Sequence, residues 1–440
     1  MQENGAHTST RHKAWQLNSN PHIFGTIAEI GAGQEVARQF FRAGKASATV
    51  AKAVSAYDMQ MSDAMYGVEQ SGRYVTRSRL ENILDTEYTD IVKRVAGSRS
   101  PDSTFFAFGD TVAAKSSESD RDCHGWMGVR FQHAAGAEPS QIVLHVRMLD
   151  KTNRDQQESL GILGVNLIHG AFTRGDQAET LVDGLVDDLV WGRIEVDYIH
   201  FEGPAFEGVH NRRLNLRLVT SSLSPVVMFT PDGCAVMPAD LLFKRHVLVL
   251  RGTFRPFTPI QADMIRCGRE VFPKDLATSP KNVVCFCEMN VARHLSHGVD
   301  QVYDLEERVV QLTELGHHVM VTSHLRYFRL SEYFTLHDKR RIGLILSVDN
   351  VRTILDDKYY DSMDGGILEA MGKLFTSDTK LLVYPNLVPG RDEIVTAENL
   401  DVPEHQRYLY QHLVHNGRIL ALEPDVETLV PFDPRVLTSE

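Results

Sequence analysis

The segment RGTFRPFTPIQADMI, residues 251–265, combines residue types that can hold a phosphate group. Gly252 follows the apolar run HVLVL, and glycine permits a sharp turn and a close approach of the backbone to a ligand. Thr258 is suited to cap the helix that follows, and free N–H groups at the start of a helix attract anions. Arg255 places a positive charge between these two residues. The spacing predicts a phosphate-binding turn, with a tight strand-to-helix corner as the alternative.

The same turn resembles the first motif of the nucleotide adenylyltransferases, Gly-x-Phe-x-Pro-x-(His/Thr)-x-x-His. In that family the last histidine steadies the phosphates that are transferred, and here its position holds Gln261. A later family motif is rich in Ser and Thr and ends in arginine at another helix start; Ser323 and Arg326 in VTSHLRYFR partly match it. The residues that we expect to hold a nucleotide are Gly252, Phe254, Arg255, Thr258, Gln261, Ser323 and Arg326.

The resemblance implies ATP or another nucleotide with Mg²⁺ as the ligand, and adenylyl transfer as the reaction if the chain is an enzyme. Glutamine donates hydrogen bonds but carries no positive charge, so we expect at most a degenerate nucleotidyltransferase. A non-catalytic protein that assembles with itself or scaffolds a partner is the alternative. No complete catalytic motif occurs in the sequence, which supports that alternative, and the catalytic residues are left unassigned.

A second glycine-rich turn, EIGAGQEVA, opens another helix near the N-terminus. Gly31 and Gly33 follow a strand pattern, as they do in a dinucleotide-binding turn, but Val36 stands at the third glycine position. An acidic residue, Asp58, lies downstream. A glycine-capped turn without a ligand is the other interpretation.

A third group of reactive side chains lies in FGDTVAAKSSESDRDCHGWMGVRF, on two expected strands and their loop. The group consists of Asp110, Lys115, Cys123, His124 and Arg130. His124 is a candidate general base and Cys123 a candidate nucleophile. A hairpin with a solvated loop explains the same residues. His200 and His210 lack the spacing of metal ligands, so we expect no metal site.

The first half of the chain should position these groups in an α+β domain. We expect a disordered tail at residues 1–22 and the domain at 23–225. Gly44 should divide two helices, the second of them containing Val50, Val54 and Tyr57. Runs such as TFFAFGDTVAA, WMGVRFQ and QIVLHVRML predict strands joined by polar turns.

The alternation of apolar runs with amphipathic segments in residues 226–440 predicts a Rossmann-like, mostly parallel doubly wound sheet. Short β-branched runs such as HVLVLRG, NVVCFCEMN and RIGLILSVDN alternate with amphipathic segments at 258–270, 304–315, 325–337 and 365–375. Ligands of such sheets bind beyond the carboxyl ends of the strands. The places to inspect are therefore 252–258, 288–290, 322–326 and 347–350.

The composition narrows the class of protein. The 440 residues are 42% apolar and 24% charged, and the formal net charge is −12 with scattered basic residues. These values argue against a nucleic-acid or anionic-lipid surface. Five cysteines without a Cys-x-x-Cys pair indicate reduced thiols. The N-terminus lacks the apolar centre of a signal peptide, and no apolar run reaches membrane-spanning length. We therefore expect a cytoplasmic homo-oligomer with a small-molecule nucleotide as partner and no membrane contact.

Along nearly its whole length the chain resembles a group of bacterial cytoplasmic proteins carried under provisional names. The stretches that carry this resemblance are EIGAGQEVARQFFRAG, DCHGWMGVRFQ, VLHVRMLD, LGVNLIHGAF, RGTFRPFTPIQADMIRC and GGILEAMGKLF. Some members are named nicotinate- or nicotinamide-nucleotide adenylyltransferases and others TonB-dependent receptors. We expect the receptor name not to apply, because the sequence shows no signal peptide. The resemblance therefore implies a family without fixing an activity.

Overall fold

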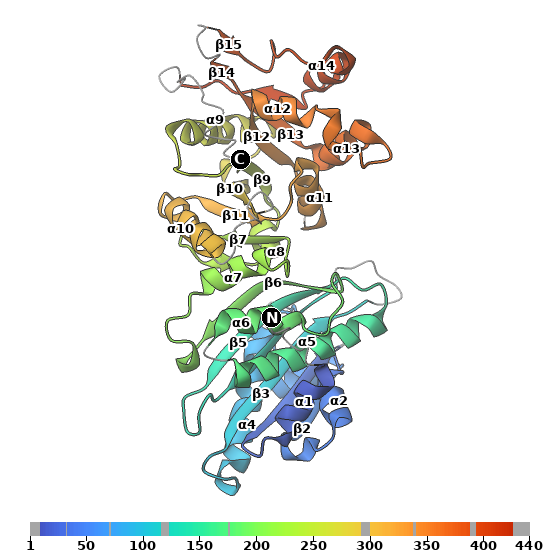
Figure 1. Cartoon of the computed structure of the whole chain (residues 1–440), viewed down its shortest axis with the longest axis vertical. Coiled ribbons are helices and arrows are strands. Elements are labelled where there is room, and N and C mark those ends of the chain that lie inside the picture. The colour runs from blue at the N-terminus through green and yellow to red at the C-terminus, as the bar shows by residue number, and fades with distance from the viewer. Residues whose placement is uncertain are drawn as a thin grey trace, which may run out of the picture. The chain divides into compact units, whose positions relative to one another are not determined.

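The computed structural model describes residues 9–31, 33–69, 72–115, 123–174, 177–291, 300–337, 340–387 and 393–425. The chain divides into two compact units, an N-terminal unit of residues Met1–Ser224 and a C-terminal unit of residues Pro225–Glu440. The boundary predicted from the sequence, between residues 225 and 226, lies one residue from this division. Figure 1 shows that each unit contains its own sheet and helices.

The N-terminal unit contains both helices and strands. Its helices are α1 Thr10–Ser19, α2 Val36–Ala43, α3 Met59–Tyr66, α4 Arg77–Val95, α5 Asn153–Thr173, α6 Ala178–Asp183 and α7 Asn211–Thr220. Its strands are β1 Ile23–Gly31, β2 Val50–Ala56, β3 Thr104–Ala113, β4 His124–Phe131, β5 Ser140–Met148 and β6 Ile194–Glu202.

These strands form one six-stranded sheet in the order β2-β1-β3-β4-β5-β6. β1 runs parallel to β2 and β3, whereas β3 to β6 are antiparallel neighbours. Helices cover both faces. A Cβ atom at Gly109 of β3 would meet Leu84 of α4, whereas the ring of the adjacent Phe108 lies against Gly164 of α5. The predicted α+β fold of this unit is confirmed.

Two local expectations for this unit are wrong. Residues 50–56 form the edge strand β2 and not a second helix, because Val50, Val54 and Ala56 gain their partners by pairing with β1 and by packing against its neighbours. Residues 10–19 form α1 and not a disordered tail, because Ala14 and Leu17 are buried. Residues 1–8 lie outside the described residues.

The C-terminal unit alternates strands and helices. Its strands are β7 Val226–Phe229, β8 Ala235–Val236, β9 His246–Arg251, β10 Val283–Asn290, β11 His318–Thr322, β12 Ile342–Ser347, β13 Lys380–Tyr384, β14 Asn386–Leu387, β15 Ile394–Val395 and β16 Ile419–Ala421. Its helices are α8 Pro238–Leu242, α9 Pro259–Asp275, α10 Asp300–Glu314, α11 Tyr327–His337, α12 Val348–Ile354, α13 Gly366–Leu374 and α14 Arg407–His415.

The main sheet of this unit has the order β16-β13-β12-β9-β10-β11-β7-β8. The first six strands of this order are parallel, and β7 and β8 add an antiparallel hairpin beyond β11. Among the parallel strands, the chain begins with β9, continues outward through β10 and β11, and returns to the other side of β9 with β12. This order is the Rossmann order, and the predicted mostly parallel, doubly wound sheet is confirmed.

Both faces of this sheet are apolar, as the uninterrupted apolar runs require. Val249 and Leu344 point to a core shared with α11 and α13. Alternate residues point the other way, and Ile345 packs against Gly268 of α9 closely enough that a Cβ there would lie 2.6 Å from its side chain. The buried strands therefore end in loops that gather at the carboxyl edge of the sheet.

Candidate functional site

The phosphate-binding turn predicted at 252–258 lies where the order of the sheet reverses. β9 is the first strand of the Rossmann order, and β10 and β12 flank it on opposite sides. Ligands of doubly wound sheets bind at this reversal, beyond the carboxyl ends of the strands. The turn thus occupies the position in the sheet that the general rule assigns to a ligand.

The start of α9 is closed by a capping box. The Oγ1 atom of Thr258 accepts a hydrogen bond from the backbone N–H of Gln261 at 3.3 Å. The Oε1 atom of Gln261 accepts from the backbone N–H of Thr258 at 2.9 Å. The predicted cap is present, and Gln261 is buried within it. Two amides that a phosphate would seek are thereby already used.

Gly252 and Phe254 shape this turn from the inside. A Cβ atom at Gly252 would lie 3.1 Å from the side-chain nitrogen of Gln261 and from the ring of Phe254, so a larger residue would require these side chains to shift by a few tenths of an ångström. Phe254 is buried and has a positive φ of 53°. Both residues therefore hold the turn in its conformation, and the phenylalanine fills space under it.

Arg255 is the exposed cation of the turn. Its side chain is 49% exposed and forms an ion pair with Asp304 of α10. Arg308 pairs with the same carboxylate and donates to the carbonyl oxygen of Thr253 at 3.0 Å. Burial acts to raise the pKa of Asp304, but Arg255 and Arg308 outweigh it and the pKa is lowered. A phosphate at this turn would compete with Asp304 for Arg255.

Ser323 and Arg326 lie at the same edge, in the loop that follows another strand. They follow β11, and β10 separates β11 from β9. Two strand spacings amount to about 10 Å, so one phosphate group cannot touch both sets, whereas a nucleotide can span them. The guanidinium of Arg326 lies 4.4 Å from the centre of the Tyr359 ring. The seven predicted residues thus form two neighbouring groups.

Arg251 connects these two groups and was missed by sequence reasoning. It forms a buried ion pair with Glu288 of β10 and donates to the carbonyl oxygens of His324 and Leu325, each at 2.8 Å. Glu288 also accepts from the hydroxyl of Thr322. The signal in the sequence was an acidic residue inside an otherwise apolar strand. Arg251 therefore fixes the 323–326 loop relative to the Gly252 turn.

Among the described residues of the second glycine-rich turn, the start of α2 is already occupied by a carboxylate. The backbone N–H groups of Val36 and Ala37 at the start of α2 donate to the carboxylate of Glu29, at 2.8 and 3.1 Å. The chain thus supplies its own anion to this helix start. Asp110 of β3 is the register partner of Glu29, and a Cβ atom at Gly33 would lie 2.7 Å from its Oδ2 atom.

Glu29 and Asp110 form a buried carboxyl pair. Asp110 has no exposed surface, its Oδ1 atom accepts from the N–H of Ile30 at 3.1 Å, and its Oδ2 atom has no hydrogen-bond partner. Burial and the neighbouring Glu29 raise the pKa of Asp110 well above its ordinary value. Burial also raises the pKa of Glu29, against the hydrogen bonds that it accepts. Burial therefore favours the protonated form of each of these two carboxyls relative to an exposed carboxyl.

The third predicted group is not one site. Asp110 pairs with Met127, whereas His124 pairs with Ala113, three residues along β3 and therefore on the opposite face of the sheet. Lys115 is exposed, and Cys123 is half-buried. Arg130 lies 3.7 Å from Asp85 of α4 and 5.6 Å from the centre of the Tyr88 ring. The structure therefore separates Asp110 from His124 and gives them different neighbours.

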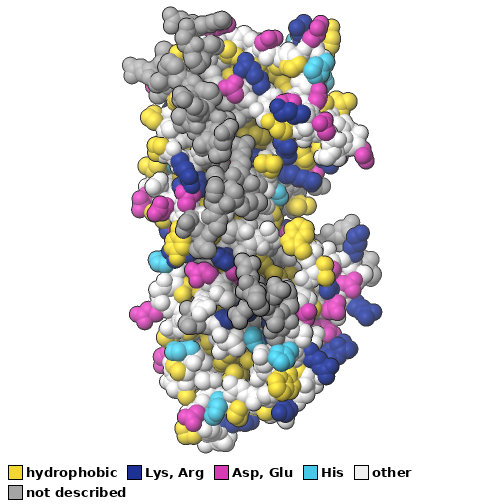
Figure 2. Space-filling model, viewed as in Figure 1, with side chains coloured by type: hydrophobic (Ala, Val, Ile, Leu, Met, Phe, Trp, Pro, Cys, Tyr) yellow, Lys and Arg dark blue, Asp and Glu magenta, His cyan; other side chains and the backbone are white. Residues whose placement is uncertain are grey.

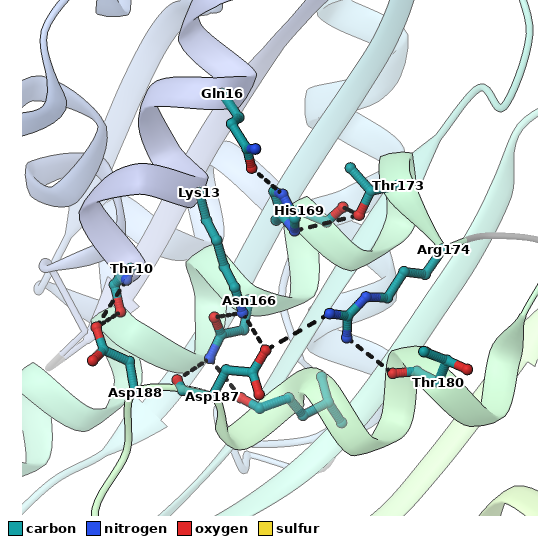
Figure 3. Close-up of polar contacts among 11 residues, drawn as sticks. Thr10, Lys13, Gln16, Asn166, His169, Thr173, Arg174, Thr180, Asp187 and Asp188 are labelled. Carbon is teal, nitrogen blue, oxygen red and sulfur yellow. Dashed lines mark hydrogen bonds and ion pairs between the residues drawn. The ribbon is translucent and has the colours of Figure 1, made fainter. Parts of the chain in front are cut away.

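A further polar cluster joins α1 to α5, as Figure 3 shows. The buried amine of Lys13 donates to Asn166 at 2.8 Å and to Asp187 at 2.7 Å. Burial lowers the pKa of Lys13, although Asp187 opposes the change. Burial and the charges of Lys13 and Arg174 lower the pKa of His169 to about 4. The cluster holds α1 in place.

A cavity of about 430 Å³ lies beside this cluster. Its lining residues are Gln16, Leu17, Asn20, Ile23, His169, Phe172, Thr173 and Arg174. His169 is tied to Gln16 through a 2.8 Å hydrogen bond, so the cluster and the cavity share a wall. Elsewhere, basic and acidic side chains are interspersed on the face drawn in Figure 2.

No family model and no curated protein matches the chain. Among solved structures, a competence or damage-inducible protein from Enterobacter asburiae is 11% identical with a TM-score of 0.28, over 38% of this chain and 99% of that one. The competence/damage-inducible protein CihA from Agrobacterium tumefaciens is 16% identical with a TM-score of 0.28, over 36% and 93%. The competence damage-inducible protein A from Klebsiella pneumoniae is 12% identical with a TM-score of 0.25, over 38% and 96%.

Similarity at this level carries no argument about what the chain does. In the part of the chain that the structure describes, no helix is both long and apolar enough to cross a membrane.

Proposed function

We propose that the C-terminal unit binds the phosphate groups of a nucleotide, ATP with Mg²⁺ in the first place, at the turn after β9. The observation that carries the proposal is the place of this turn at the reversal of the strand order, next to the half-exposed Arg255. The resemblance of the turn to the first adenylyltransferase motif supports the same ligand.

Different side chains would contact different parts of the nucleotide. The capping box already uses the amides of Thr258 and Gln261, so a phosphate would rely on the other amides of the turn and on Arg255. Arg326, about two strand spacings away, would contact a more distant part of the nucleotide. Mg²⁺ commonly bridges neighbouring phosphates and neutralises their charge.

The test is calorimetric titration of the protein with ATP and MgCl₂. Arg255→Ala should weaken binding by about 1.5–3 kcal/mol, roughly 10- to 150-fold, the range of a charge-assisted hydrogen bond. Arg329→Ala is the matched control, since this exposed arginine of α11 pairs with Glu332 and lies outside the predicted site. Unchanged affinity in Arg255→Ala would remove this residue from the site, and no binding by the parent would remove the site.

Adenylyl transfer is the reaction to assay if ATP binds. Parent protein, Gln261→His and the control Gln261→Ala would be incubated with ATP, Mg²⁺ and nicotinate or nicotinamide mononucleotide, and the dinucleotide product measured. The parent should be slow or inactive, since one preorganised donor is often worth about 10²–10³ in rate. Gln261→His should raise any residual rate. Rapid turnover by the parent would show that a histidine at position 261 is not needed for the reaction.

The same protein samples also test the alternative, that the chain is a self-assembling or scaffold protein. It is favoured if neither nucleotide binding nor turnover is detected and light scattering shows a large particle of defined size. That outcome would mean that the chain has kept the Rossmann-like sheet but does not catalyse adenylyl transfer.

A further inference from the structure

A cavity of about 300 Å³ lies in the C-terminal unit and shares no residue with the proposed nucleotide site. Its walls are the loop of residues 397–402, which follows β15, and one face of α14. Every residue that lines the cavity belongs to the described part of the chain. Sites for small molecules are typically concave, have volumes of about 300–1,000 Å³ and combine an apolar lining with a few polar groups. The volume of this cavity therefore suits one small molecule.

Part of the cavity wall is apolar and continuous with the core. Leu400, Val402 and Tyr410 are buried and belong to the main core of the unit. The half-buried Val414 packs against the same core. Tyr410 and Val414 are four residues apart on α14 and therefore lie on a single face of this helix. A ligand with an apolar side chain would extend this core surface and remove it from water.

The loop that forms the opposite wall is held in place by its own hydrogen bonds. The hydroxyl of Tyr410 donates to the carbonyl oxygen of Ala397 at 2.5 Å, which ties the loop to α14. Oδ1 of Asn399 accepts from the N–H of Thr396 at 2.7 Å, and its Nδ2 atom donates to the carbonyl oxygen of Ile394 at 3.0 Å. A preformed site binds its ligand more tightly, because little ordering of the protein has to accompany binding.

The lining of the cavity also carries charges of both signs. Glu398 and Asp401 lie on the loop and Arg407 lies on α14, and all three are exposed. None of these three side chains forms an ion pair or a hydrogen bond with another residue that the structure describes. Arg407 and Gln411 are four residues apart, so the guanidinium and the amide lie on the same face of the helix. The helix thus supplies donors to the cavity, and the loop supplies carboxylates.

These charges select the class of ligand. A simple anion would pair with Arg407 but would be repelled by the two carboxylates, and a simple amine would pair with the carboxylates but would be repelled by Arg407. A zwitterion pairs with both, and a carboxylate can bind a guanidinium through two parallel hydrogen bonds. Solvated charges on a protein surface need no ligand to explain them, but here they surround a cavity with an apolar wall.

From this geometry we infer that the cavity binds a free α-amino acid with an apolar side chain. Arg407 pairs with the carboxylate of the amino acid, and Glu398 and Asp401 pair with its ammonium group. The apolar side chain of the ligand lies against Leu400 and Val414. The binding is non-covalent and does not depend on nucleotide binding at the turn after β9.

The test is calorimetric titration of the full chain with L-leucine as the probe. The parent should bind leucine with a saturable heat, and Arg407→Ala should lower the affinity roughly 10- to 150-fold, the range of a charge-assisted hydrogen bond. Arg352→Ala is the charge-matched control, because this exposed arginine pairs with Asp349 and does not line the cavity. No binding by the parent, or equal affinity in the parent and Arg407→Ala, would overturn the proposal.

Two analogues of leucine test the recognition of a zwitterion without any variant. Isoamylamine lacks the carboxylate and isocaproate lacks the ammonium group, and each should bind at least about tenfold more weakly than leucine. Glu398→Gln combined with Asp401→Asn should weaken the binding of leucine but not that of isocaproate, a selectivity that a merely structural role of the two residues would not produce. Binding of either analogue as tightly as leucine would overturn the proposal even if the variants fail to fold.

Discussion

Among single residues, Asp110 departs strongly from the ordinary behaviour of an aspartate. It lies at the centre of the sheet of the N-terminal unit with no exposed surface and one unpaired carboxyl oxygen. Its neighbour Glu29 occupies the two amides at the start of α2 and is thereby the better placed of the two to carry the charge. Burial and the neighbouring Glu29 therefore favour the protonated form of Asp110.

Asp110→Asn should stabilise the protein increasingly as the pH rises above about 4, the ordinary pKa of an aspartate. The raised pKa means that the stabilising contribution of Asp110 is complete below its unfolded pKa of about 4 and is lost as pH rises through the folded pKa. Asparagine keeps the acceptor for the N–H of Ile30 and never ionises. We expect a gain of about 1–3 kcal/mol in the free energy of unfolding at pH 8.

Urea unfolding between pH 4 and pH 9 measures this gain. The difference between variant and parent should grow with pH, and Asp102→Asn, at an exposed aspartate, should show no such growth. A variant that is less stable than the parent at pH 8 would mean that the ionised form of Asp110 is the native one.

At the scale of helices and strands, both glycine-rich turns show the chain filling its own helix start. In one turn Thr258 and Gln261 satisfy each other, and in the other Glu29 satisfies α2. A helix start that satisfies itself is stable without a ligand. A glycine-rich pattern in a sequence therefore does not identify a phosphate site by itself. The structure must also show that nearby side chains leave the amides of the helix start available.

The capping box of α9 can be measured directly. Thr258→Ala should lower the free energy of unfolding of the C-terminal unit by about 0.5–2 kcal/mol, whereas Thr258→Ser should keep most of the cap. Thermal unfolding followed by circular dichroism would check both variants. Equal losses in Ala and Ser would show that the methyl group of Thr258 matters more than its hydroxyl.

The docking of α1 depends on the ion pair between Lys13 and Asp187. Asp187→Asn removes the charge that compensates a buried amine, and Asp187 is itself 26% exposed, so we expect a loss of about 1–3 kcal/mol. Hydrogen exchange of the α1 amides should accelerate. The double variant Lys13→Met with Asp187→Asn should recover part of the loss, and no recovery would argue against a charge effect.

At the scale of the whole molecule, the chain is two units with separate sheets and separate cores. Each unit is of ordinary domain size, and the Gly252 turn lies wholly within the C-terminal unit. The proposed nucleotide binding should therefore not require the N-terminal unit.

Residues 1–224 and 225–440, produced separately, should each fold. We expect ordinary far-ultraviolet circular dichroism and cooperative unfolding for each piece. ATP binding should remain with 225–440. An unfolded piece would show that its core needs the other unit, and ATP binding by 1–224 alone would contradict the site assignment.

The amino-acid sequence alone determined the architecture of the C-terminal unit. Strands buried on both faces must be apolar throughout, so β9, β10 and β12 are recognisable as continuous runs between amphipathic segments. The cap at Thr258 could also be recognised from the sequence, because capping depends on residues three positions apart. Local patterns of this kind are complete within a short window of sequence.

Tertiary structure alone decided the rest. Val50–Ala56 has a spacing that suits a helix, but pairing with β1 makes it the strand β2. Asp110 was expected beside His124, yet the alternation of β3 sends it to the other face. His145 is hydrogen-bonded to both His124 and Asp197, which lie 21 and 52 positions away in the sequence. The strand register and a bulge bring these three residues together. Neither can be recognised in a short stretch of sequence, because both depend on contacts between strands that are distant in the sequence.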